Sequence, residues 1–149
     1  MVYDESMEAA LHASTGYLLA RLGAESRRRW ARMLAERELT PHHFGALMVL
    51  DHHGTTHQQR LSELIGIDPR NAVPVVDLLY QRGLVQRTTD PTNRRRHALT
   101  LTPAGQEMLE VLRHEGNAVE DDLLAGLTNR ERATLHTLLG KLLRVTTPG

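Results

Sequence analysis

The chain contains no cysteine. This absence excludes disulfide bonds, thiolate-bound metal and redox sensing by cysteine. Aromatic residues are also scarce, since the 149 residues include one Phe, one Trp and three Tyr. Proteins that bind single-stranded nucleic acid stack bases on aromatic side chains, so this scarcity argues against that class.

Long apolar runs are absent too. No stretch approaches the ~20 residues that are needed to span a bilayer. The N-terminal segment carries Asp4, Glu5 and Glu8 and lacks the basic and apolar regions of a signal peptide. We therefore expect a cytoplasmic protein with no membrane partner.

Signatures of catalysis are missing as well. The sequence has no glycine-rich phosphate loop and no His-Glu-x-x-His zinc motif. Only four serines occur, and none stands in a recognisable nucleophile pattern. The sequence predicts neither an enzyme nor a bound cofactor.

Excess charge of one sign is also lacking, because 18 Lys and Arg residues balance 18 Asp and Glu residues. The distribution is nevertheless uneven. Between Thr56 and His97 the basic residues outnumber the acidic ones, whereas acids gather near both ends of the chain. A basic middle segment is the electrostatic pattern expected of a protein that binds nucleic acid.

Apolar periodicity and capping residues predict a mainly helical protein with one small β-hairpin. Thr40-Pro41, Asp68-Pro69 and Thr102-Pro103 each provide a cap followed by proline, and Thr128 with Glu131 forms a capping box. A turn at Gly66 between two short helices predicts a helix-turn-helix motif. The expected helices span residues 6–36, 41–51, 57–65, 69–82, 103 onward and 128 onward. The first is expected to be interrupted at Gly16 and Gly23.

Residues 84–101 follow the helix-turn-helix segment and show two stretches of β-type alternation. Between these stretches lie an Asp-Pro turn signal and three successive arginines, Arg94, Arg95 and Arg96. A β-ribbon with a cationic tip suits contact with a polyanion backbone and its groove. Helix-turn-helix followed by such a ribbon, or wing, is the layout of a winged-helix DNA-binding protein.

The terminal helical regions carry more leucine than one small domain needs. A two-fold dimer formed by these regions would cover the apolar surface and duplicate the DNA-binding unit. The alternative is that these leucines pack only within one protomer.

Several sequence blocks resemble the MarR family of bacterial winged-helix transcription regulators. They are Gly83-Leu84-Val85-Gln86-Arg87, Asp90-Pro91-Thr92-Asn93-Arg94-Arg95 and Leu99-Thr100-Leu101-Thr102-Pro103-Ala104-Gly105. The resemblance covers nearly the whole chain. It implies one protomer over residues 1–149, with dimerisation helices at 1–37 and 103–149 and a winged helix-turn-helix region at 40–102. It further implies a homodimer that binds a pseudo-palindromic promoter site, usually as a repressor released by a small ligand.

The helix from Pro69 is expected to enter the major groove of DNA by its N-terminal end. Arg70 can bond guanine and Asn71 can bond adenine, each by two hydrogen bonds. The alternative is that Arg70 binds phosphate and Asn71 assists capping. Pro74 removes one helical N–H and predicts a kink, unless the helix begins near Asn71 and places Pro74 in its first turn.

In the wing, the resemblance implies that Arg95 enters the minor groove while Arg94 and Arg96 bind flanking phosphates. Asn93 stands where the family usually has an aspartate, so we expect a weaker hydrogen bond to a guanidinium. Asp90 is an alternative partner for Arg94 or Arg95. The competing interpretation is that the three arginines are only solvated turn residues.

The start of the helix expected at residues 57–65 offers Thr56, His57, Gln58 and Gln59 to backbone phosphates. Arg60 and Arg87 are weaker candidates for DNA contact. Arg82 and Asp77 are expected to be structural.

The family often binds aromatic acids between the dimer helices and the DNA-binding unit. Trp30, Phe44 and Met48 are candidates to line such a cleft for a small aromatic or phenolic ligand; equally, they are ordinary core residues. No metal is expected, although a zinc-responsive alternative would use Glu38, His42 or His43, Glu110 and His114. A winged-helix protein-interaction module is the remaining alternative, but it predicts an apolar or acidic wing.

Overall fold

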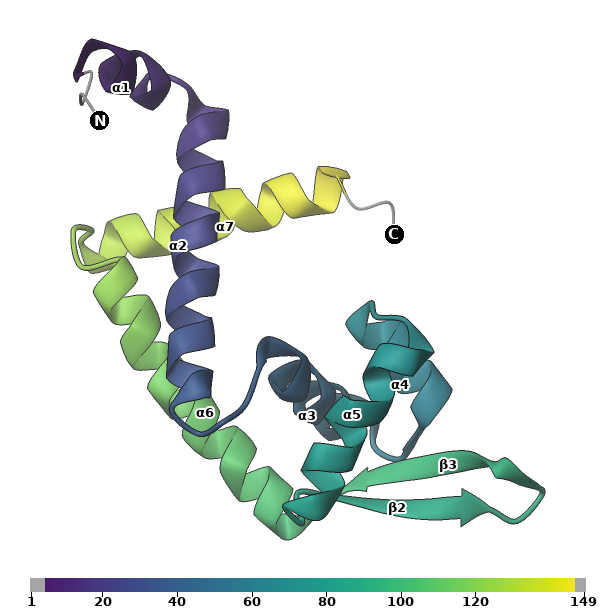
Figure 1. Ribbon diagram of the computed structural model, residues 1–149. Helices are drawn as coiled ribbons and strands as arrows, with labels where there is room; N and C mark the ends of the chain where they lie inside the picture. The colour runs from purple at the N-terminus through teal and green to yellow at the C-terminus, as the bar shows by residue number, and fades with distance from the viewer. Residues whose placement is uncertain (1–4, 147–149) are drawn as a thin grey trace.

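The computed structural model describes residues 5–146, which form a mainly helical protomer with a small antiparallel sheet (Figure 1). The predicted fold class is thereby confirmed. The first four and last three residues of the predicted dimerisation segments, with Asp4 among them, lie outside the described residues. The elements in chain order are α1 (Glu5–His12), α2 (Thr15–Ala35), α3 (Pro41–His53), β1 (Thr56–His57), α4 (Gln58–Ile65), α5 (Pro69–Gln81), β2 (Val85–Asp90), β3 (Asn93–Leu101), α6 (Pro103–Leu123) and α7 (Asn129–Thr146).

The N-terminal region consists of two helices, not of the single helix predicted over residues 6–36. The break falls at Ser14, whose hydroxyl oxygen accepts a hydrogen bond from the backbone N–H of Tyr17 and so caps α2. Gly16 and Gly23 both lie inside α2 and do not interrupt it. The start of α2 is thus determined by Ser14, which accepts a hydrogen bond from an N–H that has no partner within the helix.

The helix-turn-helix motif consists of α4 and α5, joined through Gly66 in a left-handed conformation with φ of 75°. The Asp68 carboxylate accepts a hydrogen bond from the backbone N–H of Arg70 at 2.8 Å and caps α5. Because α5 begins at Pro69, the alternative start near Asn71 is wrong. The helix continues as one element past Pro74 to Gln81.

The sheet has the strand order β1-β3-β2, with both neighbouring pairs antiparallel. The β2–β3 pair forms the predicted wing, in which Val85 lies opposite Leu101 and Thr89 opposite His97. The short strand β1 was not predicted, because its residues were expected to begin a helix. Thr56 pairs with Leu99, so β1 attaches the start of α4 to the base of the wing.

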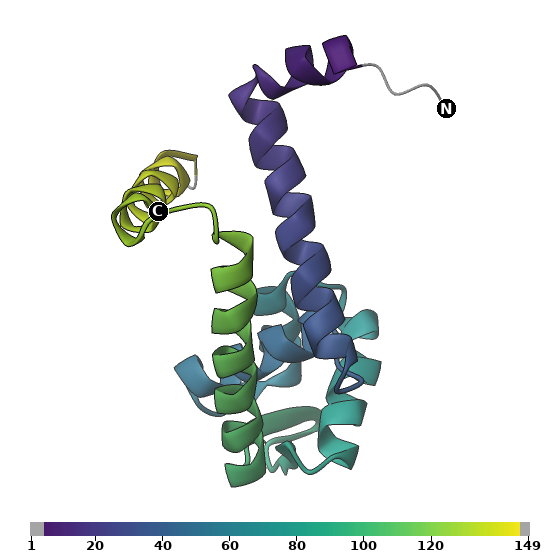
Figure 2. The same cartoon turned by 90° about the vertical axis from the view of Figure 1, so that its left-hand side faces the viewer.

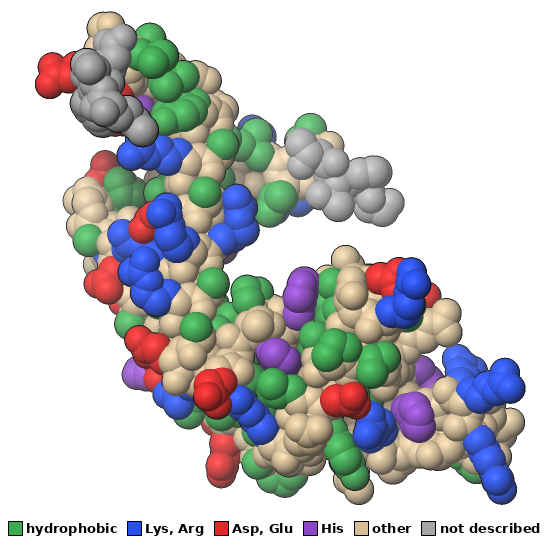
Figure 3. Space-filling view, viewed as in Figure 1, with side chains coloured by type: hydrophobic (Ala, Val, Ile, Leu, Met, Phe, Trp, Pro, Cys, Tyr) green, Lys and Arg blue, Asp and Glu red, His purple; other side chains and the backbone are tan. Residues whose placement is uncertain are grey.

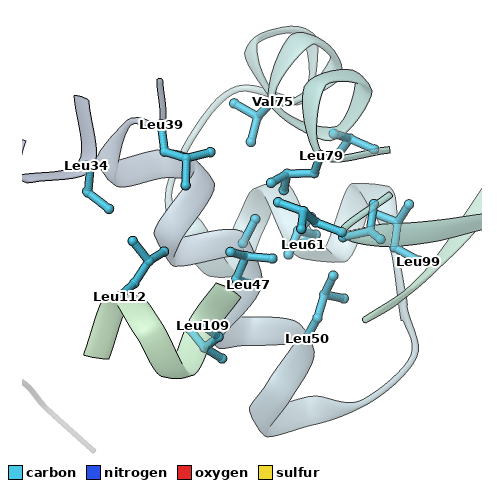
Figure 4. Close-up of a cluster of buried hydrophobic side chains, with 14 of the residues drawn as sticks. Leu34, Leu39, Leu47, Leu50, Leu61, Val75, Leu79, Leu99, Leu109 and Leu112 are labelled. Atoms are coloured by element: carbon cyan, nitrogen blue, oxygen red, sulfur yellow. The ribbon is translucent and has the colours of Figure 1, made fainter. Parts of the chain in front are cut away.

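The core of the winged-helix unit (residues 40–102) is built from leucines of successive helices and of β3, and it extends to α2 and α6 (Figure 4). Gly105 allows α6 to pack closely against this unit, since a Cβ at that position would lie 2.0 Å from the Leu84 carbonyl oxygen. The fully buried leucines are Leu34, Leu47, Leu61, Leu79, Leu99, Leu109 and Leu112.

The long helices α2 and α6 pack against each other, and α1 and α7 extend away from the winged-helix unit (Figures 1 and 2). Trp30 of α2 lies against Gly116 of α6, where a Cβ would meet its ring at 2.4 Å. Arg37 forms an ion pair with Glu115 nearby. No helix within residues 5–146 has the length and apolar character to cross a membrane.

Candidate nucleic-acid interface

A groove of about 500 Å³ lies between the start of α4, the N-terminal end of α5 and the wing. It brings together six of the residues predicted to contact DNA: His57, Gln58, Gln59, Arg70, Arg95 and Arg96. Lys and Arg side chains gather at the tip of the wing, where it projects from the molecule (Figure 3). The remaining residues that line the groove are Pro69, Val73 and His97.

The N-terminal end of α5 presents its side chains to solvent. The side chain of Arg70 is 92% exposed, and its Nε donates to Asp68 Oδ1 at 3.3 Å. The hydrogen bond from the backbone N–H of Arg70 contributes most to lowering the pKa of Asp68. Asp68, and not Asn71, is the N-cap of α5. Asn71 is exposed but does not line the groove.

The wing tip is ordered by two side chains that accept hydrogen bonds locally. Asn93 Oδ1 accepts from the backbone N–H of Arg95 at 3.0 Å, rather than from a guanidinium as expected. Asp90 accepts from Thr92 and contacts His57, so its predicted pairing with Arg94 or Arg95 is wrong.

The three arginines of the wing are exposed. Within residues 5–146, no carboxylate lies within ion-pairing distance of Arg94, Arg95 or Arg96. Their charge is therefore available to an anion.

Thr56 does not belong to this surface. Its side chain is buried and its hydroxyl donates to the Gly54 carbonyl at 2.8 Å, because β1 turns it inward. The expectation that it contacts phosphate is wrong in this arrangement. Two buried side-chain atoms in the groove, Gln58 Oε1 and His97 Nδ1, have no hydrogen-bond partner among residues 5–146.

Two other arginines of the basic middle segment, Arg82 and Arg87, are engaged in the fold. Arg82 donates to the carbonyls of Arg37 and Glu38 at 2.7 and 3.2 Å, and so ties the end of α5 to the loop after α2. Arg87 pairs with Asp77 at 2.8 Å and lies over the Tyr80 ring. The structural roles predicted for Arg82 and Asp77 are confirmed.

A second, mostly apolar pocket of about 400 Å³ lies between α2 and α3. Trp30 and Phe44 form one of its walls with ring centroids 5.2 Å apart, and Arg27 also lines it. Met48, which was predicted to line the same cleft, does not. Its sulfur lies 3.4 Å from Arg113 on α6 instead.

The residues of the zinc-responsive alternative do not come together among residues 5–146 of the protomer. Among the described residues, no group of three His, Asp or Glu side chains is placed to hold a metal ion. Glu38 pairs with Arg82, and the Nδ1 atom of His43 accepts from the backbone N–H of Thr40 at 2.9 Å. His43 is buried, and burial lowers its pKa. Glu38, His42, Glu110 and His114 thus form no common site within the described part of one protomer.

Comparisons with known proteins agree with this geometry. The model of the MarR family matches residues 39–97. The chain is 32% identical over 141 residues to a transcriptional regulatory protein for the hcr operon of Thauera aromatica, which covers 94% of this chain and 85% of the relative.

Two solved structures share the fold. A variant of Escherichia coli MarR in which serine replaces a cysteine, complexed with operator DNA, gives a TM-score of 0.67 at 25% identity. This match covers 86% of this chain and 92% of that one. BpsR of Bordetella bronchiseptica, whose DNA binding is regulated by 6-hydroxynicotinic acid, gives a TM-score of 0.69 at 26% identity. This match covers 85% of this chain and 96% of that one. These likenesses cover most of the chain, and the chain therefore belongs to the MarR family of transcriptional regulators.

Proposed function

We propose that this protein is a repressor that binds a pseudo-palindromic promoter site as a homodimer and is released by a small aromatic or phenolic ligand. The observation that supports this most is the single groove shared by the exposed start of α5 and the exposed arginines of the wing. Such a protein acts in the cytoplasm, where the promoter lies.

The proposed DNA contacts follow from the chemistry of each group. The N-terminal end of α5 enters the major groove, where Arg70 bonds guanine and Asn71 bonds adenine. Arg95 enters the adjacent minor groove, while Arg94 and Arg96 neutralise phosphates on either side. Asn93 holds the backbone of the wing tip in position. His57 and Gln58 contact phosphates at the start of α4.

The proposed dimer surface lies on α1, α2 and α7, where large apolar side chains stand exposed. A cleft of about 530 Å³ between α2, α6 and α7 continues this surface and includes Leu19, Leu22 and Leu139. Apolar surface of this extent is unfavourable in water, and a second copy covers it. The exposed members are Met7, Leu11, Leu18, Leu19, Leu22, Leu138, Leu139, Leu142, Leu143 and Val145.

The proposed ligand site is the pocket of Trp30 and Phe44. It lies between α2, which belongs to the dimer helices, and α3, which belongs to the winged-helix unit. An aromatic ring would stack in this pocket, and Arg27 would bind a carboxylate or phenolate. A ligand there would change how the two units pack and so change the spacing of the two DNA-binding helices.

The test of DNA binding is selection of bound duplexes from a random-sequence pool, followed by titration at several salt concentrations. If each protomer neutralises ~3–4 phosphates, log affinity falls with log salt at a slope of roughly −5 to −7. Absence of duplex binding in dilute buffer would overturn the proposal.

The test of ligand binding uses Trp30, the one tryptophan of the chain, as a fluorescence reporter. Aromatic acids such as salicylate are titrated against the wild type and Arg27→Ala. Binding should quench Trp30 emission, reduce affinity for the selected duplex and weaken in the variant. If no aromatic acid changes either signal, the pocket is not the ligand site.

A further inference from the structure

The DNA-facing side of α5 carries an exposed apolar side chain. Val73 is 45% exposed although Val75 and Val76, on the same helix, are buried in the core. The next residue, Pro74, is also exposed. The first two turns of α5 therefore present two polar residues, Arg70 and Asn71, followed by an apolar pair.

Local helix stability does not account for this arrangement. Valine has a lower helix propensity than alanine because its branched side chain loses χ1 freedom, and proline removes a helical hydrogen bond. Exposure of Val73 to water adds a further unfavourable contribution, since apolar area gains free energy only when it is removed from water. A partner that covers the side chain would recover that free energy.

The position of Val73 identifies which part of the partner it meets. Val73 follows Arg70 by three residues, so the two side chains share one face of α5 and both line the groove beside the wing. Three residues rise about 4.5 Å along a helix, compared with about 3.4 Å for each base pair of duplex DNA. Val73 thus reaches a base pair one or two steps from the one that Arg70 contacts.

The chemistry of the base edges then indicates which group Val73 contacts. In the major groove, the C5-methyl group of thymine is the one apolar group among hydrogen-bond donors and acceptors. Valine offers no donor or acceptor, so placing it against a polar base edge would leave that edge without water or a hydrogen bond. Against a thymine methyl group, both surfaces are removed from water together.

We propose that Val73 selects a thymine in each half-site by contact with its C5-methyl group, one or two base pairs from the guanine bound by Arg70. This inference rests on the proposed DNA-binding function and names part of the sequence that the protein prefers. It makes Val73 a specificity-determining residue that adds little to non-specific affinity.

The experiment removes the methyl group from the DNA and the side chain from the protein, separately and together. The probe is a duplex selected from a random-sequence pool by the wild-type protein, in which each thymine is replaced in turn by deoxyuridine. Deoxyuridine lacks only the methyl group and keeps every hydrogen-bonding atom. Wild type and Val73→Ala are titrated against each duplex at one salt concentration.

For the wild type, one thymine per half-site should be sensitive, with affinity falling about fourfold for each methyl group removed. Val73→Ala should bind the unmodified duplex about fourfold more weakly per half-site and should not respond to deoxyuridine at that position. The matched control is Val111→Ala on α6, because Val111 is 41% exposed and lies outside the groove. This control should keep the sensitivity of the wild type.

Two results would overturn the inference. Either no thymine is sensitive to loss of its methyl group, or Val73→Ala responds to deoxyuridine as strongly as the wild type does. Both differ from failure of the proposed function, in which the wild type selects no duplex at all.

Discussion

The Nε2 atom of His57 lies 3.2 Å from the Oδ2 atom of Asp90, and this contact joins the start of α4 to the end of β2. Asp90 also accepts hydrogen bonds from the backbone N–H and the hydroxyl of Thr92, at 2.8 and 2.6 Å. Together, with Thr92 contributing most, these donors lower the pKa of Asp90 to about 2. One carboxylate thus holds the turn of the wing against the helix-turn-helix motif.

Asp90 should make the stability of the protein depend on pH in the acid range. Its pKa in the folded state lies below the ordinary value of 3.8, so its contribution is present at neutral pH and is lost as pH falls from about 4 towards 2. Asp90→Asn should therefore lower the free energy of unfolding at pH 7, and the deficit relative to wild type should shrink with acidification. Urea unfolding of both proteins between pH 7 and pH 2.5 measures this.

Asp122→Asn, an exposed position on α6 outside the wing, serves as the control and should follow the wild type at neutral pH. A constant gap between Asp90→Asn and wild type over the whole range would show that the charge of Asp90 is not involved.

Arg95 should contribute to the affinity for every duplex. Its side chain is exposed at the wing tip while Asn93 fixes its backbone. Arg95→Ala should weaken binding about tenfold per protomer, the loss expected for one charged hydrogen bond. The salt dependence should become shallower by about 2 for the dimer, and the preference for A·T-rich flanks should diminish.

Fluorescence anisotropy at several salt concentrations measures this change. The comparison is Arg130→Ala, which removes an exposed arginine at the start of α7. If both variants lose affinity equally, the wing has no special role in binding.

Charge placed in the apolar cleft between α2, α6 and α7 should separate the proposed dimer. Leu19→Glu and Leu139→Glu each bury a carboxylate if a second copy covers that surface, which is strongly unfavourable. We expect monomers in sedimentation velocity and loss of high-affinity DNA binding, because one protomer holds only a half-site.

Val111→Glu, on an exposed part of α6 outside this cleft, should remain dimeric. Circular dichroism checks whether each variant keeps its helices. Dimers of unchanged stability in both leucine variants would refute this interface.

Gly116→Ala should disturb the wall of the proposed ligand pocket. A Cβ at this position would lie 2.4 Å from the Trp30 ring, so the ring must move. Overpacking of this kind should reduce the free energy of unfolding by about 1–3 kcal/mol. The emission of Trp30 should shift at the same time, and affinity for an aromatic acid should fall.

Gly140→Ala on α7 is the matched control, since its nearest neighbour would be Arg144 Nη1 at 3.8 Å. Alanine there should stabilise the helix by about 0.5–1 kcal/mol. Urea unfolding followed by circular dichroism compares the two. A neutral effect at Gly116 would mean that α2 and α6 can move apart without cost.

Much of the secondary structure was predictable because helix boundaries depend on neighbouring residues. Thr40-Pro41, Asp68-Pro69 and Thr102-Pro103 begin helices where predicted, and Thr128 exchanges hydrogen bonds with Glu131 as a capping box does. The wing followed from its alternation and its turn residues. The location of Arg70 and of the three wing arginines on exposed segments followed from the same local patterns.

Other features depended on residues distant in the sequence. Strand β1 exists because Thr56 and His57 pair with Leu99 and Ala98, and no local pattern marks two residues as a strand. That pairing turned Thr56 inward and removed it from the candidate site. Met48 likewise does not line the predicted cleft, because its sulfur contacts Arg113 on α6. Val73 was not among the predicted contacts, although its spacing of three residues from Arg70 predicts that both side chains share one face of α5.

The sequence by itself determined most helix boundaries after residue 40, the wing and the exposed basic residues that are proposed to bond DNA, because caps, turns and periodicity act over a few residues. Tertiary structure alone decided that the start of α5 and the wing border one groove and that Asp90 bonds His57 instead of an arginine. It also decided that the residues of the zinc alternative stay apart within the described part of the protomer. These outcomes depend on which surfaces pack together in the core, and packing joins residues whose separation along the chain carries no local signal.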